Sequence, residues 1–531
     1  MARLSTRGRA VVAISSLLII ALVAAGIVVV VSIGRAVGDL VGAVEDVVAT
    51  APTTPGSTPS QEPSPSSPVP SATPRSPVED PGTAVEDPAS IPGKYRAALS
   101  EPREDSAYPE VGDPGVDALH YGLDLTWDRD AEVLSGRARV TFRATADASS
   151  VTLDLGEPLR VRSARLDGAT VRTDHDGTHL VVHAPVKDDA VHTLVVDYRG
   201  TPQPVAAPST RSDMTGGLGW TVDPRGQVWT MQEPYGAHTW YPVNDHPSDK
   251  AFYDITVRAP RGWVGIANGA LRSRKDTADA TVTRWSLASP ASSYLTTIAI
   301  GDYRQFTAKA AGGRVVSLWA APGSTRAAND VRVAADALDW LESRLGEYPF
   351  ETLGFVVVDS DSAMETQTMI TMGDTEYALE PATFVHELAH QWYGDLVTPT
   401  DWRDVWMNEG MATYLQVVWE SQHGGYPLEA HLALWRMEDG SLRADAGPPA
   451  AFDPEDFGVN NVYTSPALMW HDLRGRLGDD AFWRIVRDWP RVHDLGHATR
   501  TEYLAWVEKR ADVGDLDPFF DAWLLGETTP H

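Results

Sequence analysis

The sequence predicts an α+β protein in which a β-rich region precedes a mainly helical region. Short runs of alternating or β-branched residues, separated by turn formers, fill residues 106–305. Segments with helical periodicity follow over residues 306–531. An apolar run and a segment rich in proline, serine and threonine precede both regions. A chain of 531 residues is long enough for two or three domains, so these shifts are expected to mark domain boundaries.

The N-terminal residues have the pattern of a membrane anchor. Residues 1–9 carry three arginines, and residues 10–34 form an apolar run without a charged side chain. About 20 apolar residues suffice to cross a bilayer, and preceding arginines favour a cytoplasmic N-terminus. We therefore expect one transmembrane helix over residues 10–34, a single-pass location in the cell membrane and an extracytoplasmic catalytic region. The alternative is a cleaved signal peptide, in which case the protein is secreted.

Residues 35–105 are expected to form a disordered linker. Proline, serine and threonine dominate its central part, which reads APTTPGSTPSQEPSPSSPVPSATPRSP. Such a composition buries too little apolar surface to fold, and its prolines favour extended conformations. The segment is therefore expected to act as a stalk or spacer.

Composition excludes several classes of function. The net charge of −29 argues against a nucleic-acid partner, because binding to phosphates needs a basic surface. The absence of cysteine excludes disulfides, thiolate metal ligands and cysteine nucleophiles. The oligomeric state stays open.

The β-rich region is predicted to form a large twisted or sandwich-like domain over residues 106–305. Turn formers such as Asp167-Gly168 and Asp176-Gly177 separate its strands. The expected strands are residues 119–127, 137–143, 179–183, 192–198, 252–257 and 294–300. Residues 231–253, MQEPYGAHTWYPVNDHPSDKAFY, are unusually rich in proline, histidine and aromatics, which on composition alone favours a structured corner loop.

The second region reads as one buried strand, LGFVVVD at residues 353–359, among several helices. The predicted helix starts share capping residues or proline in the first turn. These starts are Ser324 for a helix to about residue 345, Glu380-Pro381, Asp404, Thr499 with Glu502, and Asp517-Pro518.

Candidate metal ligands gather in residues 384–414, which read FVHELAHQWYGDLVTPTDWRDVWMNEGMATY. His386, Glu387 and His390 form an HExxH pattern, and positions i and i+4 of a helix share one face, so both histidines can hold one metal ion. Glu409 on the following helix supplies a third N/O ligand and leaves one tetrahedral position for water. This open site without thiolates predicts one catalytic zinc ion per chain, with Glu387 as general base. The alternative, a helix with two histidines that bind no metal, leaves Glu409 unexplained.

This stretch resembles the motif of the gluzincin aminopeptidases, the family of aminopeptidase N and the leukotriene-hydrolysing enzymes. The resemblance covers about residues 108–525 and includes EPYGAHTWYPVNDHPSDKA and VYTSPALMWHDLRGRLGDDAFWRIV. It implies a saddle-like N-terminal β domain followed by a thermolysin-like, mainly helical zinc catalytic domain. It also implies an aminopeptidase, here of a bacterial, actinobacterial and membrane-anchored type, that removes N-terminal residues from peptides by attack of metal-activated water.

The resemblance also implies roles for individual residues. His386, His390 and Glu409 match the zinc ligands, Glu387 matches the general base, and Tyr463 matches the tyrosine whose hydroxyl helps to hold the oxyanion.

Substrate-binding residues are implied in the same way. Glu365 of SAMET and Glu233 of EPYGA match two acids that bind the free α-amine of a peptide. Ala363 and Met364 would lie beside the substrate, which would add to them as a strand. The expected partners are therefore peptides with a free N-terminus, together with the membrane through the single N-terminal helix.

The sequence departs from the family pattern at four positions. Ser362 and Thr366 stand where the family has glycine and asparagine, and Ser465 and Pro466 replace a basic residue and glycine after Tyr463. We expect these changes to affect rate and specificity rather than the type of reaction. Many family members continue into a helical domain that encloses the active site, and the end of this sequence at residue 531 predicts a more open cleft.

Two further functions compete with the aminopeptidase. One is a surface binding protein on a degenerate protease scaffold, which the altered SAMET and YTSP motifs suggest. The other is a zinc hydrolase that attacks a different bond, such as an internal peptide bond or an epoxide.

Overall fold

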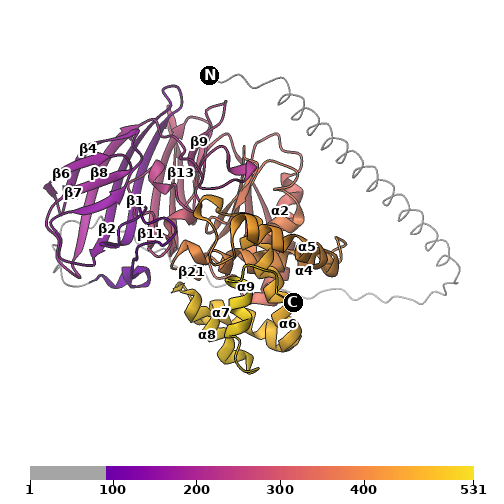
Figure 1. Cartoon of the computed structure of the whole chain (residues 1–531). Coiled ribbons are helices and arrows are strands. Elements are labelled where there is room, and N and C mark those ends of the chain that lie inside the picture. Colours follow the sequence, from indigo (N-terminus) through magenta and orange to yellow (C-terminus); the bar gives the residue numbers. More distant parts are fainter. Residues whose placement is uncertain (1–90, 531) are drawn as a thin grey trace, which may run out of the picture. The chain divides into compact units, whose positions relative to one another are not determined.

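The computed structural model describes residues 91–530 (Figure 1). The expected segments 1–9 and 10–34 and most of the expected linker 35–105 lie outside these residues. The described chain begins with a short 3-10 helix, η1 (Gly93–Ala98), inside the range that was expected to be linker. Ordered structure therefore starts before the expected boundary at residue 106.

The localisation predicted from the sequence needs correction. Within residues 91–530, no helix is long and apolar enough to cross a membrane. The two longest helices described, α2 (Ala327–Leu345) and α5 (Leu428–Ala446), have 19 residues each but carry several charged side chains. The spanning helix expected over residues 10–34 lies outside the described part, and the single-pass location is not retained.

The largest sheet of the β-rich region has eight strands in the order β13-β14-β11-β1-β2-β8-β4-β5 (Figure 1). All neighbouring strands pair antiparallel except β1 and β11, which run parallel. The strands are β1 (Val116–Asp128), β2 (Val133–Ala144), β4 (Leu159–Leu166), β5 (Ala169–Thr170), β8 (Val191–Gly200), β11 (Lys250–Pro260), β13 (Ala270–Asp276) and β14 (Ala280–Ser292).

Two smaller sheets complete this region. They are β3 (Val151–Asp154), β7 (His179–His183) and β6 (Arg172–Asp176), and β12 (Val264–Ala267), β15 (Ile298–Gly301), β10 (Val228–Met231) and β9 (Gly219–Val222). Buried apolar side chains from all three sheets join one hydrophobic core.

Five of the six predicted strands are confirmed, and the sixth is half wrong. Residues 294–300 divide into a 3-10 turn, η4 (Ser293–Leu295), and strand β15. The Gln232 side-chain amide donates to the carbonyl oxygens of Ser293 at 2.9 Å and Thr296 at 3.0 Å. Because a side chain binds these carbonyls, the backbone needs no neighbouring strand there.

The second region is built on a five-stranded sheet in the order β16-β17-β18-β20-β19. Its three central strands are parallel, and both edge strands pair antiparallel. The strands are β16 (Arg304–Lys309), β17 (Val315–Ala320), β18 (Leu353–Val358), β19 (Ala363–Met364) and β20 (Met369–Gly373).

Helices make up the rest of this region. Besides α2 and α5 they are α3 (Pro381–Ala389), α4 (Trp406–Gln422), α6 (Thr464–Leu477), α7 (Asp479–Val492), α8 (Arg500–Ala511) and α9 (Asp517–Leu524). Helix α3 lies against α2 and α4, and α4 lies against α6. Strand β21 (Thr398–Pro399) pairs with β22 (His497–Ala498) beside these helices.

The predicted helix signals are confirmed in part. Ser324 lies two residues before Arg326, the N-cap of α2, which has no side-chain cap, and α4 begins at Trp406, two residues after Asp404.

Pro381 is the first residue of α3, where a missing N–H costs no helical hydrogen bond. Thr499 and Glu502 form a capping box at the start of α8, and α9 begins at Asp517.

A buried lysine joins the two regions. The Lys250 ammonium on β11 donates to the carbonyl oxygens of Asp395 at 2.9 Å, Leu396 at 3.0 Å and Gly496 at 3.0 Å. Burial lowers the pKa of Lys250 to about 7. Since residues 395–396 follow shortly after α3, this contact ties the β-rich region to the loop beside the candidate site.

Candidate active site

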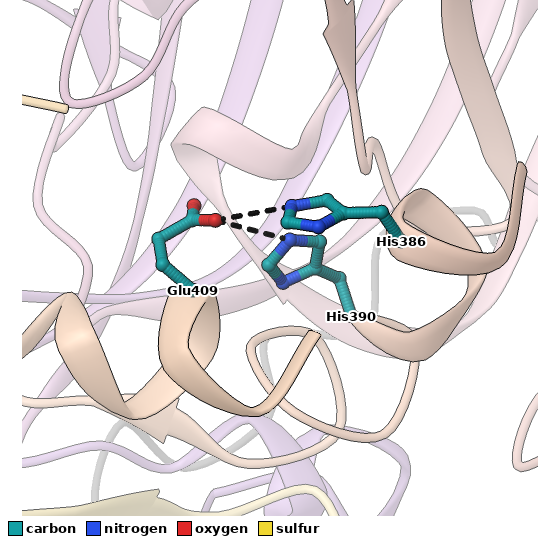
Figure 2. Close-up of side chains that lie close together, drawn as sticks. All are labelled: His386, His390 and Glu409. Atoms are coloured by element: carbon teal, nitrogen blue, oxygen red, sulfur yellow. Dashed lines mark hydrogen bonds and ion pairs between the residues drawn. The ribbon is translucent and has the colours of Figure 1, made fainter. Parts of the chain in front are cut away.

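His386 and His390 meet Glu409 at the junction of α3 and α4. His386 lies in the last turn of α3, and His390 directly follows that helix with a helical backbone (φ −60°, ψ −26°). Glu409 lies in the first turn of α4. The Nε2 atoms of His386 and His390 lie 3.2 Å and 3.4 Å from Oε2 of Glu409 (Figure 2). The two imidazoles and the carboxylate therefore converge on one point.

The surroundings of both imidazoles fix their orientation. Nδ1 of His386 lies 3.1 Å from Oε1 of Gln416, and Nδ1 of His390 lies 3.1 Å from the carbonyl oxygen of Tyr393. Because both partners are acceptors, each Nδ1 can donate its proton to them, and each Nε2 would then be free to coordinate a metal ion beside Glu409. This set of two nitrogens and one oxygen, with ligand atoms within 4.8 Å of one another, fits a single zinc ion.

The electrostatics of this cluster attract positive charge. Burial alone would raise the pKa of Glu409, but His390 and His386 hold it at about 2, so the carboxylate is ionised. Burial also disfavours a charge on His390, yet Glu409 and Glu365 raise its pKa well above the ordinary value. A cation at this point would relieve an excess of buried negative charge.

Glu387 is placed to act on a molecule in the same cavity. Its side chain lines the cavity and the residue is only 7% exposed. Burial raises the pKa of Glu387 well above its usual value, with further contributions from Glu365 and Glu409. A carboxylate with a raised pKa is better matched to accept a proton near neutral pH.

Two further carboxylates come from different regions of the fold. Glu233 follows β10 and Glu365 follows β19. Each has a buried Oε1 atom without a hydrogen-bond partner in the described structure, and carboxylate oxygens of both lie within 4.8 Å of one on Glu409. Burial and neighbouring carboxylates raise the pKa of both groups. Unpaired buried acceptors of this kind match the donors of an ammonium group.

Tyr463 immediately precedes α6 and faces the same cluster. Its ring lies 6.1 Å from the ring of His386, nearly parallel at 26°. Its hydroxyl oxygen accepts a hydrogen bond of 2.9 Å from Nη1 of Arg211. Burial raises the pKa of Tyr463 well above its usual value, so the phenol is protonated and can donate.

A cavity of about 350 Å³ between the two regions contains all of these groups. Leu218, Trp229 and Met231 give part of its wall an apolar character. Every site residue predicted from the sequence lines it, namely Glu233, Ala363, Met364, Glu365, His386, Glu387, His390, Glu409 and Tyr463.

Arg211 also lines the cavity, and no pattern in the sequence indicates it. It lies in an irregular segment next to η2 (Ser212–Met214), without a spacing that indicates a site. Its relation to Tyr463 appears only in the folded chain.

Three of the four departures from the family pattern have local contacts or positions that leave this geometry in place. Pro466 is the third residue of α6, within the first turn, where backbone N–H groups have no helical partner, so the helix begins directly after Tyr463. Ser465 bonds to Asp439 of α5, and Thr366 bonds to the carbonyl oxygen of Met369.

Comparisons with known proteins show that this chain is similar to peptidases. The family model described as the peptidase family M1 domain matches residues 330–523, and the one described as the peptidase M1 N-terminal domain matches residues 117–295. A curated relative, "Aminopeptidase N" of Streptomyces lividans, is 27% identical over 446 residues, which cover 77% of this chain and 50% of the relative. "Aminopeptidase N" of Acetobacter pasteurianus is 26% identical over 329 residues, which cover 56% of this chain and 88% of the relative. The chain spans about half the length of the first curated relatives it matches.

Solved structures share the same fold. An M1 zinc metallopeptidase from Deinococcus radiodurans superposes with a TM-score of 0.71 and 28% identity, over 80% of this chain and 98% of that one. A mutant of the Deinococcus protein, bound to a Tyr-Ser-Ala substrate, gives the same TM-score with 27% identity and the same coverage of both chains.

Proposed function

The chain belongs to the M1 family of zinc metallopeptidases, and on that basis we propose that it is an aminopeptidase that removes N-terminal residues from peptides. One observation supports this activity above all. Glu365, which is buried, and Glu233, which is half-buried, each have an unpaired buried oxygen, and both lie beside the His386–His390–Glu409 cluster. They would anchor a free α-amine next to the metal, which restricts cleavage to the first peptide bond.

The cofactor is one zinc ion, and His386, His390 and Glu409 are the residues that would hold it. When bound there, zinc acidifies a water molecule and polarises a carbonyl group, which is the chemistry of peptide hydrolysis. Gln416 and the Tyr393 carbonyl keep the two imidazoles in the tautomer that this requires.

Glu387 would act as general base and acid. Its buried carboxylate takes a proton from the attacking water and later gives one to the leaving amine. Tyr463 would donate its hydroxyl proton to the oxygen that becomes negative as the carbonyl is attacked.

The substrate backbone would lie along the edge strand β19. Ala363 and Met364 form this edge, so a peptide can add to the sheet by backbone hydrogen bonds. The added strand runs directly into Glu365, which would end the binding site at the peptide's amino group.

We also propose the domain division that goes with this family. Residues 106–305 would form a saddle-like β domain that contributes Glu233, and residues 306–531 a thermolysin-like catalytic domain that contributes the other site residues. The change from β sheets to a helix-covered sheet near β16 supports this boundary.

A digest of a peptide mixture with and without a zinc chelator tests the proposal. Mass spectrometry should show products shortened one residue at a time from the N-terminus, and the chelator should abolish them. Products from internal cleavage, or shortening that resists the chelator, would contradict the proposed function.

A further inference from the structure

A segment of the β-rich region is bound to the loop that leads to Tyr463. The carbonyl oxygen of Pro208 accepts from the amide of Phe457 at 2.9 Å, and Oγ of Ser209 donates to the Phe457 carbonyl at 2.5 Å. Oγ1 of Thr210 donates to Oδ1 of Asp456 at 2.8 Å. We call residues 208–211 the clamp segment. It fixes the position of a loop that ends only a few residues before the tyrosine.

Arg211 ends the clamp segment and is itself held on two sides. Its Nε and Nη2 donate to the two carboxylate oxygens of Asp213 at 3.0 Å and 2.6 Å, which is a bidentate pair. Its Nη1 donates to the carbonyl oxygen of Gly458 at 3.1 Å and to the hydroxyl oxygen of Tyr463 at 2.9 Å. The guanidinium is thus rigidly placed, although its side chain is 30% exposed at the cavity.

The contact between Arg211 and Tyr463 determines which of the two groups donates the hydrogen bond. A guanidinium has only donors, so in the Arg211–Tyr463 hydrogen bond the phenol oxygen must be the acceptor. The hydroxyl proton is then left for another acceptor, and in residues 91–530 Arg211 is the one hydrogen-bond partner of this hydroxyl. The ring of Tyr463 lies 6.1 Å from that of His386 and both residues line the same cavity, so this proton is available to a molecule bound there.

The positive charge of Arg211, whose Nη1 lies 2.9 Å from the Tyr463 hydroxyl oxygen, also makes the phenol a stronger hydrogen-bond donor. Burial and the carboxylate of Glu409 raise the pKa of Tyr463, and Arg211 opposes them. A guanidinium that donates to the phenol oxygen strengthens the hydrogen bond that the phenol donates in turn to an oxyanion.

We propose that Arg211 is a positioning residue that orients and polarises the Tyr463 hydroxyl towards the substrate's carbonyl oxygen. The inference rests on the proposed function, since it concerns how Tyr463 serves that reaction. It assigns to one residue of the β-rich region, Arg211, a part in transition-state stabilisation through Tyr463.

A double-mutant cycle tests this inference. Loss of one oxyanion donor typically lowers kcat about 100- to 1000-fold, and we expect that range for Tyr463→Phe. Arg211→Met should lower kcat about 10- to 100-fold with KM changed less than about 3-fold, because the donor remains but is misplaced. In the Tyr463→Phe background, Arg211→Met should change kcat by less than about 3-fold. An equal loss in both backgrounds would overturn the inference.

Another role for Arg211 would give a different kinetic pattern. If it bound the carboxylate at the far end of short peptides, Arg211→Met would raise KM for tripeptides and leave aminoacyl-arylamides unaffected. That outcome would also overturn the inference. We expect similar losses of kcat for both substrates, because both pass through the same oxyanion.

Two matched variants separate positioning from folding. Thr210→Val removes a hydrogen bond of the same clamp segment without touching Tyr463, and its kcat should stay within about 2-fold of the wild type. Arg211→Lys keeps a positive donor but loses the bidentate pair with Asp213, so it should recover part of the activity that Arg211→Met loses. If Thr210→Val lost as much activity as Arg211→Met, a general role of the clamp segment in folding would replace the inference.

Binding of a phosphinic dipeptide with a free amine gives a readout other than turnover. The oxygens on its tetrahedral phosphorus imitate the oxyanion. Calorimetry on the zinc-loaded protein should therefore show that Arg211→Met weakens the affinity for this ligand by about the same factor as it lowers kcat. Binding of the free amino-acid product should not change. Equal weakening of both ligands would overturn the inference. An inactive wild type would instead count against the proposed function, so the two failures are distinguishable.

Discussion

Glu233 of the β-rich region and Glu365 of the helical region have carboxylate oxygens within 4.8 Å of one another, and each has a buried Oε1 atom without a hydrogen-bond partner in the described structure. Two like charges so close, and so poorly solvated, are unfavourable unless a cation lies between them. An α-ammonium group offers three donors for this purpose. In the proposed function, this pair would give the β-rich region a part in binding the substrate's amino group.

Glu365→Gln should weaken the recognition of free amines. The amide keeps the shape but removes a charged acceptor, so kcat/KM for an aminoacyl-arylamide should fall about 10- to 100-fold. Glu347→Gln is the matched control, because the Glu347 side chain is 90% exposed and should be neutral. Steady-state kinetics of both variants measure this difference. A kcat/KM of Glu365→Gln equal to that of the control would contradict the account.

Glu387→Gln should remove catalysis without removing the metal. A general base typically contributes about 100- to 10,000-fold to the rate, so kcat should fall by a factor in that range. Zinc content, measured by atomic absorption, should stay at one ion per chain, because the metal-holding cluster consists of His386, His390 and Glu409. Retention of normal turnover would show that another group activates the water.

Zinc should stabilise the fold through the same cluster. A ligand that binds only the native state at about 100 times its Kd adds about 3 kcal/mol to the free energy of unfolding. Glu409→Ala should abolish this gain in urea titrations with and without zinc. Asp515→Ala alters a second acidic cluster, of Glu508, Asp515 and Asp517, and should leave the gain unchanged. If the Asp515 variant lost the gain instead, zinc would bind elsewhere.

A pH dependence of stability should arise at Asp105. Its carboxylate accepts from the backbone amides of Ala107, Tyr108 and Trp402, which attaches residues 105–108 to the helical region. Burial, together with Asp401, raises the pKa of Asp105 from 3.8 to about 6. Between these values the folded protein binds more protons than the unfolded chain, so this stabilisation is complete below pH 4 and is lost as the pH rises through 6.

Asp105→Asn does not titrate, so the wild type should lose stability relative to it as the pH rises. Two pKa units correspond to about 3 kcal/mol at most. Urea unfolding at pH 4.5 and pH 7.5 should therefore show a larger advantage of the wild type at the lower pH. A larger advantage at pH 7.5 would mean that the three backbone donors hold the carboxylate ionised in the folded state.

How much of the site could be predicted from the sequence depended on the distance between its parts along the chain. His386, Glu387 and His390 lie within one helical turn, and Glu409 lies on the next helix, so their spacing alone predicted the cluster. Glu233, Glu365 and Tyr463 carry no such spacing and were found only through resemblance to a family. Arg211 was missed because its partner Tyr463 is 252 residues away and Arg211 itself belongs to no pattern.

The fold, too, could be predicted where the interacting residues are close together along the chain. Strands with local alternation and turns such as Asp167-Gly168, where both residues have positive φ, were predicted correctly. The run 294–300 is apolar enough for one strand, but its first residues belong to the 3-10 turn η4, where Gln232 binds the carbonyl oxygens of Ser293 and Thr296. Interactions of a side chain with a distant backbone leave no periodic trace in a sequence.

The most direct test of the central claim compares one tripeptide with its N-acetylated form, in the same reaction, with the zinc-loaded protein. The account predicts release of the first residue from the free peptide and at least about 100-fold slower cleavage of the blocked one, because acetylation removes the charge that Glu233 and Glu365 bind. Equal rates for both peptides would contradict it, since hydrolysis would then not depend on a free amino terminus.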